Sequence, residues 1–206
     1  MSETRCKYPN DPEQAKWITL TKQGDRAAFG NLVEKYQRPV YNLCYHMLRN
    51  ADEAEDATQE VFLRAYAKLD TYDEQRQFST WLFSIASHYC LDKLKSPRLP
   101  LVSWDSLRDY WPDGDTAQPE KILLGAETTQ EVRALLETLK PDYRAAIILK
   151  YWYTLSYQEI AQTLDATVSA IKSRLFYARK KMAQTAIQQQ RAVIGSSIGA
   201  ELFIGG

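Results

Sequence analysis

The sequence predicts an all-α fold made of two helical domains, and three observations support this prediction. Apolar residues recur at three- and four-residue spacing over long stretches, which is the period of one face of an α-helix. No run among the 206 residues shows the alternation of apolar and polar side chains that marks a half-buried strand. A proline-rich, acidic segment interrupts the helical periodicity near the middle of the chain, so one helical block lies on each side of it.

Three helices are expected in the first block. The first follows Asp25, a possible N-cap, and Pro39 is expected to kink it. The second is expected over residues 52–69, starting with a D-x-x-E pattern that resembles a capping box. The third is expected from Ser79 or Thr80 to about residue 95. The first helix carries an apolar stripe, made of Phe29, Leu32, Val33, Tyr36, Val40, Tyr41 and Cys44.

The interruption predicts a flexible acidic linker over residues 98–124. Residues 100–120 hold five acidic side chains and one basic one, and prolines punctuate the segment. The expected domains are therefore residues 12–97 and 125–187. Residues 188–206 form a tail of unknown role, whose AVIGSSIGAELFIGG stretch lacks lysine and arginine. We expect this tail to be disordered or bound to a partner.

Charge is separated along the chain although its formal total is zero. Residues 46–75 carry eight acids and three bases, a net charge of −5. Residues 168–187 carry five bases and no acid, a net charge of +5. An acidic surface early and a basic helix late suggest two kinds of partner.

Several classes of protein are not expected from these residues. The N-terminus lacks the apolar core of a secretory signal, and no apolar run reaches the roughly 18 residues that span a bilayer. Three widely spaced cysteines, an odd number, fit a reducing cytoplasm. There is no Gly-rich phosphate loop and no G-x-S-x-G motif. Cys44 and His46 lie on different faces of a helix, so no metal site is expected there.

The segment LSYQEIAQTLDATVSAIKSRLFYARKKM, residues 155–182, predicts a helix-turn-helix. Ser156 and Glu159 form an S-x-x-E capping box, and Asp165 can occupy a left-handed turn position. A second, basic helix then begins near Thr167 or Ser169. Its inward positions are Val168, Ile171 and Leu175, and its outward or flanking candidates are Ser169, Ala170, Lys172, Ser173, Arg174, Phe176 and Tyr177. A basic solvated helix in a generic bundle is the alternative.

These residues closely resemble region 4.2 of the extracytoplasmic-function (ECF, group IV) sigma factors. DATQEVFLRAYAKLDTY resembles region 2.2 of that family, and FSTWLFSIASHYCLDKL resembles regions 2.3 to 2.4. The resemblance covers about residues 14–184 apart from the linker, with two motif blocks in the family's order. It implies that the first domain is sigma region 2 and that the second is sigma region 4.

The resemblance implies a polymerase-binding face on the helix of region 2.2. Asp56, Gln59, Glu60 and Leu63 follow one another at i, i+3, i+4 and i+7, which places them on one side of that helix. In the family this face docks on the clamp helices of the β′ subunit, and region 4 meets the β flap. A solvated acidic helix face is the alternative.

The resemblance also implies that the next helix and the loop before it bind the promoter −10 element as single-stranded DNA. The residues placed there by resemblance are Arg76, Gln77, Phe78, Ser79 and His88, with Lys93 and Lys95 as phosphate contacts. His88 departs from the family, which commonly carries Asn at this position, so the preferred base is left open. Trp81 is expected to be buried.

Binding of the −35 duplex is implied for the basic helix. The residues are Ser169, Ala170, Lys172, Ser173, Arg174, Phe176, Tyr177, Arg179 and Lys180. Lys172 and Arg174 are of the type that reads guanine or grips phosphate, whereas Arg179 and Lys180 are expected to follow the backbone. The linker, in the family, threads the active-site and RNA-exit channels of the polymerase.

The expected partners are core RNA polymerase, promoter DNA and an anti-sigma factor that holds the protein in a compact inhibited state. No enzymatic activity, cofactor, metal, small-molecule substrate or membrane insertion is expected. One alternative is a stand-alone helix-turn-helix regulator that does not bind core polymerase, which leaves the region 2 motifs unexplained. A second is an enzyme or helical scaffold whose motifs are coincidental.

Overall fold

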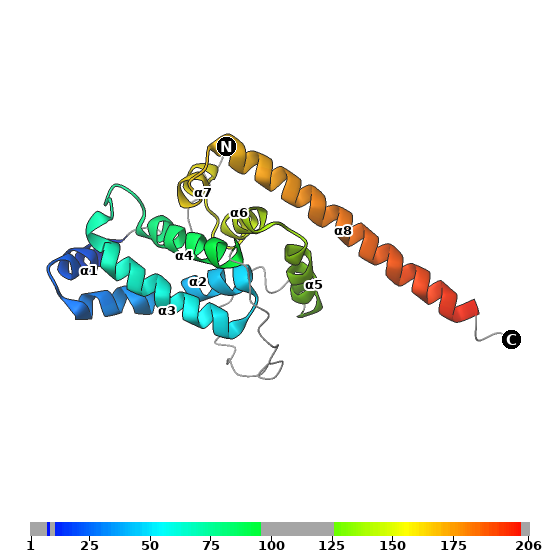
Figure 1. Ribbon diagram of the computed structural model, residues 1–206, viewed down its shortest axis with the longest axis horizontal. Coiled ribbons are helices and arrows are strands. Elements are labelled where there is room, and N and C mark those ends of the chain that lie inside the picture. The colour runs from blue at the N-terminus through cyan, green and yellow to red at the C-terminus, as the bar shows by residue number, and fades with distance from the viewer. Residues whose placement is uncertain (1–7, 9–10, 96–125, 203–206) are drawn as a thin grey trace.

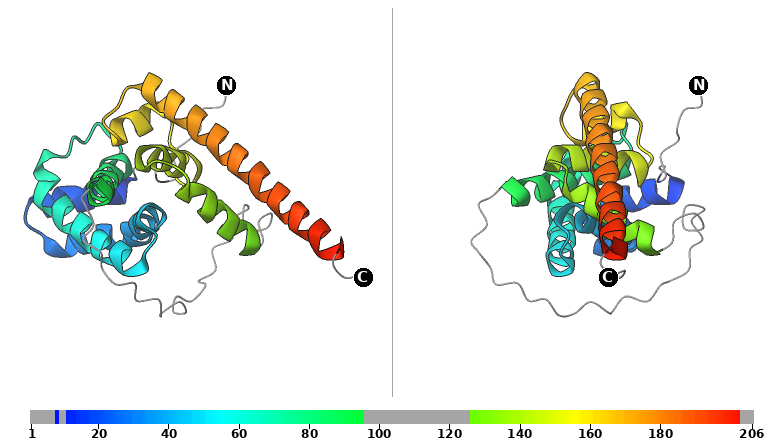
Figure 2. Two further views of the ribbon diagram at one scale, coloured as in Figure 1. Left: turned by 45° about the vertical axis from the view of Figure 1, so that its right-hand side comes forward. Right: turned by 90° about the vertical axis from the view of Figure 1, so that its right-hand side faces the viewer.

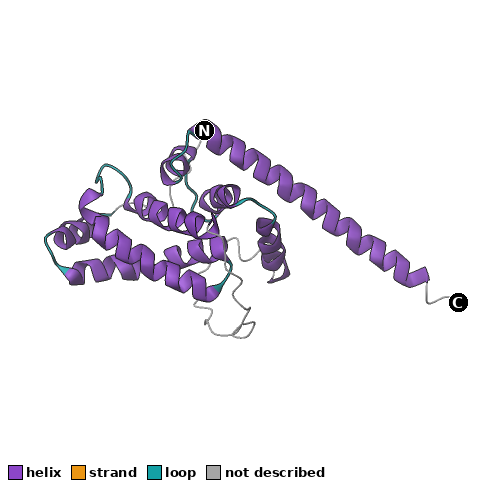
Figure 3. Cartoon of the chain, viewed as in Figure 1, coloured by secondary structure: helices purple, strands orange, loops and turns teal. Residues whose placement is uncertain are grey.

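The computed structural model describes residue 8, residues 11–95 and residues 126–202, with side chains for residues 8, 11–95 and 132–188. Within these ranges every regular element is a helix, as the colouring of Figure 3 shows. The all-α prediction is confirmed for this part of the chain. The predicted linker, residues 98–124, lies outside the described residues.

The first helical block, residues 11–95, packs three long helices together, with a short one at their edge (Figure 1). They are α1 (Pro12–Lys22), α2 (Arg26–Leu48), α3 (Ala51–Lys68) and α4 (Phe78–Lys95), and the 3-10 turn η1 (Leu69–Thr71) follows α3. The Asp25 cap is confirmed, because its carboxylate accepts from the backbone amides of Ala27 and Ala28 at 2.8 and 3.2 Å.

The predicted start of α3, at Asp52, was one residue late, and the predicted cap, Asp52, was two residues from the observed one. Asn50 caps this helix, accepting from the amide of Glu53 at 2.9 Å, and the helix begins at Ala51. Asp52 and Glu53 instead occupy the first turn, where the helix dipole favours negative charge. The first helix of the block likewise has an Asp11 cap and a proline at its first position.

The second helical block, residues 126–202, contains α5 (Ala126–Glu137), α6 (Pro141–Tyr151), α7 (Tyr157–Thr163) and α8 (Val168–Leu202). Both halves of the predicted capping box are present at α7: the Ser156 amide donates to Glu159 Oε2 at 2.7 Å, and the Glu159 amide donates to Ser156 Oγ at 3.2 Å. Asp165 has φ +47°, the predicted left-handed turn between α7 and α8.

Helix α8 is longer than the sequence predicted. Its backbone stays helical to Leu202, past the expected end near residue 190, so residues 188–202 continue the helix. No proline interrupts this stretch, and an isolated glycine costs a helix only about 0.5–1 kcal/mol relative to alanine. Figures 1 and 2 show the C-terminal end of α8 extending away from the other helices.

The two helical blocks share one hydrophobic core. Helix α4 packs against α6 and α7, and α2 packs against α6. Tyr153, in the loop after α6, donates from its hydroxyl to the Pro39 carbonyl at 2.6 Å, and its ring lies 4.6 Å from that of Phe83. Arg144 of α6 donates from Nη1 to the Met47 carbonyl at 2.8 Å. We call this contact between the blocks the seam.

Candidate functional site

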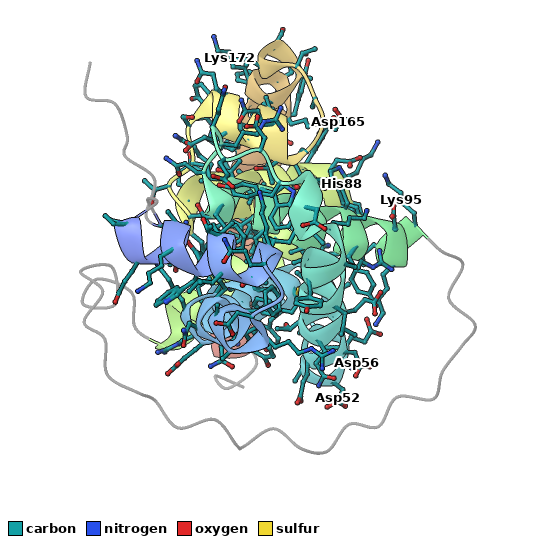
Figure 4. All side chains as sticks on the ribbon, turned by 90° about the vertical axis from the view of Figure 1, so that its left-hand side faces the viewer. Asp52, Asp56, His88, Lys95, Asp165 and Lys172 are labelled. Carbon is teal, nitrogen blue, oxygen red and sulfur yellow. The ribbon has the colours of Figure 1, made fainter. Side chains whose placement is uncertain are left out.

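The outer side of α3 presents all four residues predicted to bind polymerase. Asp56, Gln59 and Leu63 are exposed, Leu63 to 66%, and Glu60 is half-buried. Glu60 also receives a hydrogen bond from Arg64 Nε at 2.7 Å. On the opposite side of the helix Ala57, Val61 and Ala65 are buried, and Leu69 is buried in the following turn, as predicted. Figure 4 shows Asp52 and Asp56 together at one end of the molecule.

A groove that sequence reasoning missed adjoins this face. It has a volume of about 460 Å³ and is lined by Arg26, Phe29, Val33, Gln59, Phe62, Leu63 and Tyr66 from α2 and α3. The sequence assigned Phe29 and Val33 to the apolar stripe of α2, and both are only half-buried. Exposed Leu63 and Tyr66 were the available signal, because large apolar side chains on an otherwise polar helix face indicate contact with a partner.

The start of α4 buries two residues that were predicted to read the −10 element. Phe78 is 1% exposed and packs against the rings of Tyr36, Tyr72 and Trp81. Ser79 is fully buried and donates from Oγ to the Tyr8 carbonyl at 2.8 Å. Trp81 is half-buried rather than buried. In this arrangement Phe78 and Ser79 do not reach the surface, so their contact with DNA stays a prediction.

The remaining −10 candidates are more accessible. Arg76 is exposed 3.9 Å from Asp73, and Gln77 is half-buried with its Oε1 atom enclosed. His88 is exposed on α4 with Nδ1 2.8 Å from the Ser84 carbonyl. Because a carbonyl only accepts, Nδ1 is the donor in this contact, and Nε2 takes no part in it.

Two lysines at the end of α4 complete the −10 set. Lys93 is half-buried with Nζ 3.8 Å from Glu53, and Lys95 is exposed at the last residue of the helix. Figure 4 shows His88 and Lys95 between the acidic end of the molecule and the end that carries Lys172. These two exposed members of the −10 set therefore lie between the two other predicted surfaces.

The first turns of α8 form the predicted recognition helix, residues 168–182. Ile171 and Leu175 are buried and Val168 is half-buried, as expected for its inward side. The outward set divides by exposure: Ser169, Lys172, Ser173, Phe176, Tyr177, Arg179 and Lys180 are exposed, whereas Ala170 and Arg174 are half-buried. Small, buried Ala161 of α7 lies on the side of the helix pair that packs inward. A short helix, a tight turn and a basic helix follow one another as in a helix-turn-helix.

Nothing in the described ranges gathers three or more side chains that could hold a metal ion. Cys44 and Cys90 are buried free thiols, and the pKa of Cys90 is raised by its hydrogen bond with Cys44 and by burial. Raised thiol pKa values favour the neutral form, which packs like a small apolar side chain. No described helix has the length and apolar character needed to cross a bilayer.

Comparison with known proteins matches both helical blocks to one family. Residues 32–98 match Sigma-70 region 2, and residues 129–182 match Sigma-70 region 4. The chain is 33% identical over 183 residues to the ECF RNA polymerase sigma factor SigW of Bacillus subtilis (strain 168), covering 81% of this chain and 93% of SigW.

Solved structures share the fold. CnrH, solved in complex with the cytosolic domain of CnrY, aligns with TM-score 0.64 and 22% identity over 86% of this chain and 99% of CnrH. The sigma factor RpoE, solved with the anti-sigma factor NepR from Bartonella quintana, aligns with TM-score 0.55 and 20% identity over 76% of this chain and 94% of RpoE. From the two matched regions and the identity to SigW, this chain belongs to the family of ECF RNA polymerase sigma factors.

Proposed function

We propose that this protein directs core RNA polymerase to promoters by binding the polymerase and two promoter elements. The observation that supports this most is the pairing of an exposed acidic face on α3 with an acid-free, basic recognition helix at the start of α8. These two surfaces fit partners of opposite charge, a basic protein surface and DNA. The protein contributes binding rather than bond chemistry, and it acts where the polymerase acts, in the cytoplasm.

Polymerase binding is assigned to Asp56, Gln59, Glu60 and Leu63 on α3. The carboxylates would meet basic side chains of the β′ clamp helices, and the apolar atoms of Leu63 would be buried at the centre of the contact. The adjoining groove offers further apolar area from Phe29 and Tyr66. A helix with only a solvated acidic face would have no reason to present such area beside its charges.

The −35 duplex is assigned to the recognition helix. An α-helix fits the major groove, where Arg and Lys side chains can donate to guanine O6 and N7. Lys172 and Arg174 are assigned to base or nearby phosphate contacts, and Arg179 and Lys180 to the backbone. The exposed rings of Phe176 and Tyr177, 57% and 55% exposed, add apolar contact area on the same helix.

The −10 element is assigned to α4 and the loop before it. Gln77 Oε1 and Thr80 Oγ1 are enclosed atoms without a hydrogen-bond partner among the described residues. An enclosed polar atom that lacks a partner costs about 1–3 kcal/mol, so a base bound here would gain by supplying one. Engagement of Phe78 and Ser79 requires a rearrangement at the start of the helix.

The closed arrangement of the two blocks is proposed as a resting state. Elements named −35 and −10 lie about 25 base pairs apart, which at 3.4 Å per pair is about 85 Å of duplex. Helices α4 and α7 pack directly against each other, so the blocks must separate before both surfaces can meet DNA. Polymerase binding would fix that separation and raise the effective concentration of each surface at its element. An anti-sigma factor, such as the one solved with RpoE, would oppose this step.

Run-off transcription with core polymerase tests the proposal. The purified chain is added to core enzyme from the organism that carries it, with linear genomic fragments as templates. Promoter-dependent transcripts that require the chain support the proposal. Absence of transcripts together with absence of core binding in a pull-down without DNA contradicts it, and DNA binding in that case would favour a stand-alone regulator.

A further inference from the structure

One histidine lies half-buried at the seam between the helical blocks. His46, in the last turns of α2, packs its ring 5.0 Å from the ring of Trp152, which follows α6 in the second block. The chain has two histidines, and the other, His88, is exposed on α4. His46 is therefore the group in the seam whose charge changes closest to neutral pH.

The charged groups near His46 are mostly cationic, and they come from α2, α5 and α6. Arg49 follows it at the end of α2, and Arg133 faces it from α5. Burial, and then the nearby guanidinium of Arg144 on α6, lower the pKa of Arg49. Glu137 supplies a carboxylate, but this carboxylate is paired with Arg49. A small cavity of about 30 Å³ is lined by Tyr45, His46, Arg49, Arg133 and Leu136.

Arg144 shows that the seam has little room for another positive charge. It is 8% exposed, and its guanidinium donates to the carbonyls of Leu136 at 3.0 Å, Met47 at 2.8 Å, and Glu137 and Leu139 at 3.4 Å. These carbonyls and the Glu137 carboxylate are acceptors that the arginines already use. A proton on His46 would place a further cation beside Arg133 and Arg49 in a half-buried setting, where desolvation and like charge both oppose it.

We propose that the seam is an acid-sensitive latch: the closed arrangement requires neutral His46, and protonation of His46 separates the two helical blocks. The latch is a property of the free chain and does not depend on polymerase. Its consequence for transcription, a larger open fraction in a mildly acidified cell, rests on the proposed function.

The direction follows from the pKa values of the two arrangements. Burial, and then the positive charges of Arg133 and Arg49, lower the pKa of His46 to about 4 in the closed form. An exposed imidazole has a pKa of 6.5. The stability that neutral His46 contributes to the closed form is therefore fully present above pH 6.5, and it is lost as the pH falls from 6.5 toward 4. Relative to pH 7.5, the ratio of open to closed chains should rise about fourfold at pH 6 and about 30-fold at pH 5.

Single-molecule energy transfer on the full chain measures this ratio. Dyes are attached to two non-natural side chains that replace Gln23, which directly follows α1, and Gln184 on α8; both residues are exposed, and they lie in opposite blocks. In the parent chain, the energy-transfer efficiency should fall as the pH is lowered from 7.5 to 5. His46→Gln, which cannot gain a proton, should show a flat response, whereas the matched variant His88→Gln should keep the response of the parent.

Three results would overturn the latch. They are constant energy transfer in the parent chain over this pH range, a full response in His46→Gln, and loss of the response in His88→Gln. If His46→Gln does not fold, proton NMR of the two histidine Cε1–H signals decides instead, with the signals assigned by His88→Gln. A His46 signal that titrates near pH 6.5 while energy transfer stays constant rejects the proposal, and titration that accompanies opening supports it.

Discussion

Helices α3 and α4 are neighbours of equal length, yet they treat their predicted binding residues in opposite ways. All four candidates on α3 reach the surface, whereas Phe78 and Ser79 at the start of α4 lie inside the first block. Helix α3 packs against α2 and α4, while α4 packs against α2, α3, α6 and α7. On this comparison we propose an order of events: the predicted polymerase-binding face is already exposed in the closed form, and the predicted −10 surface is completed only later.

The largest expected effect is on the free energy of unfolding, and it differs between substitutions on these two helices. Phe78→Ala should lower the free energy of unfolding by about 3–5 kcal/mol, because it leaves a cavity between Tyr36 and Tyr72. Leu63→Ala, at an exposed position of α3, should change the free energy of unfolding by less than about 0.5 kcal/mol. Urea unfolding of both variants checks this. A stability loss below about 1 kcal/mol for Phe78→Ala would mean that this side chain is not held in the core.

The next effect concerns binding alone. Asp56→Ala combined with Gln59→Ala should weaken binding to core polymerase by about 2–3 kcal/mol, or about 30- to 150-fold, and leave unfolding unchanged. Both side chains are exposed, so their removal affects the partner rather than the core. Glu13→Ala, an exposed acid on α1, is the matched control. Fluorescence anisotropy with labelled chain measures the affinity, and equal affinities for both variants would remove the α3 face from the proposed interface.

Sequence patterns predicted the local parts of this structure well. The capping box at Ser156 and the left-handed residue Asp165 could be anticipated because each depends on neighbours within a few positions. Asp25 was identified for the same reason. The α3 cap was misplaced because Asn50 and Asp52 are both good caps, and local sequence does not rank them.

The seam could not be predicted, since its contacts join distant parts of the chain. Tyr153 and Pro39 are separated by 114 positions, and the acceptor is a backbone carbonyl that no sequence pattern marks. The burial of Phe78 was missed because an aromatic residue after a polar loop fits both a core position and a base-stacking position. The half-buried setting of His46 likewise depends on Trp152 and Arg133, which approach it from the second block.

A smaller effect is expected on the recognition helix. Arg174→Ala should cost about 1–3 kcal/mol at the −35 element and relax the preference at one base pair, provided that this half-buried guanidinium reads a base. Arg179→Ala should weaken all sequences about equally, because its side chain is assigned to phosphate. Binding of holoenzyme to a set of single-base variants of the promoter measures both. Unchanged promoter affinity in Arg174→Ala would remove Arg174 from the set of DNA contacts.

The smallest effect concerns the stability of the closed form, in which the α3 face is exposed and the start of α4 is buried. Tyr153→Phe removes the hydroxyl that donates to the Pro39 carbonyl and keeps the ring beside Phe83, so the closed form should lose about 1 kcal/mol, or about fivefold in the open-to-closed ratio. Its energy transfer should fall at pH 7.5, and its affinity for core polymerase should rise by at most that factor, because the α3 face is exposed in both forms. Tyr157→Phe is the matched control, because Tyr157 is half-buried on α7 and takes no part in this hydrogen bond. If Tyr153→Phe leaves the open fraction unchanged, this hydrogen bond does not hold the blocks together, and the closed form depends on Arg144 and the apolar contacts of the seam.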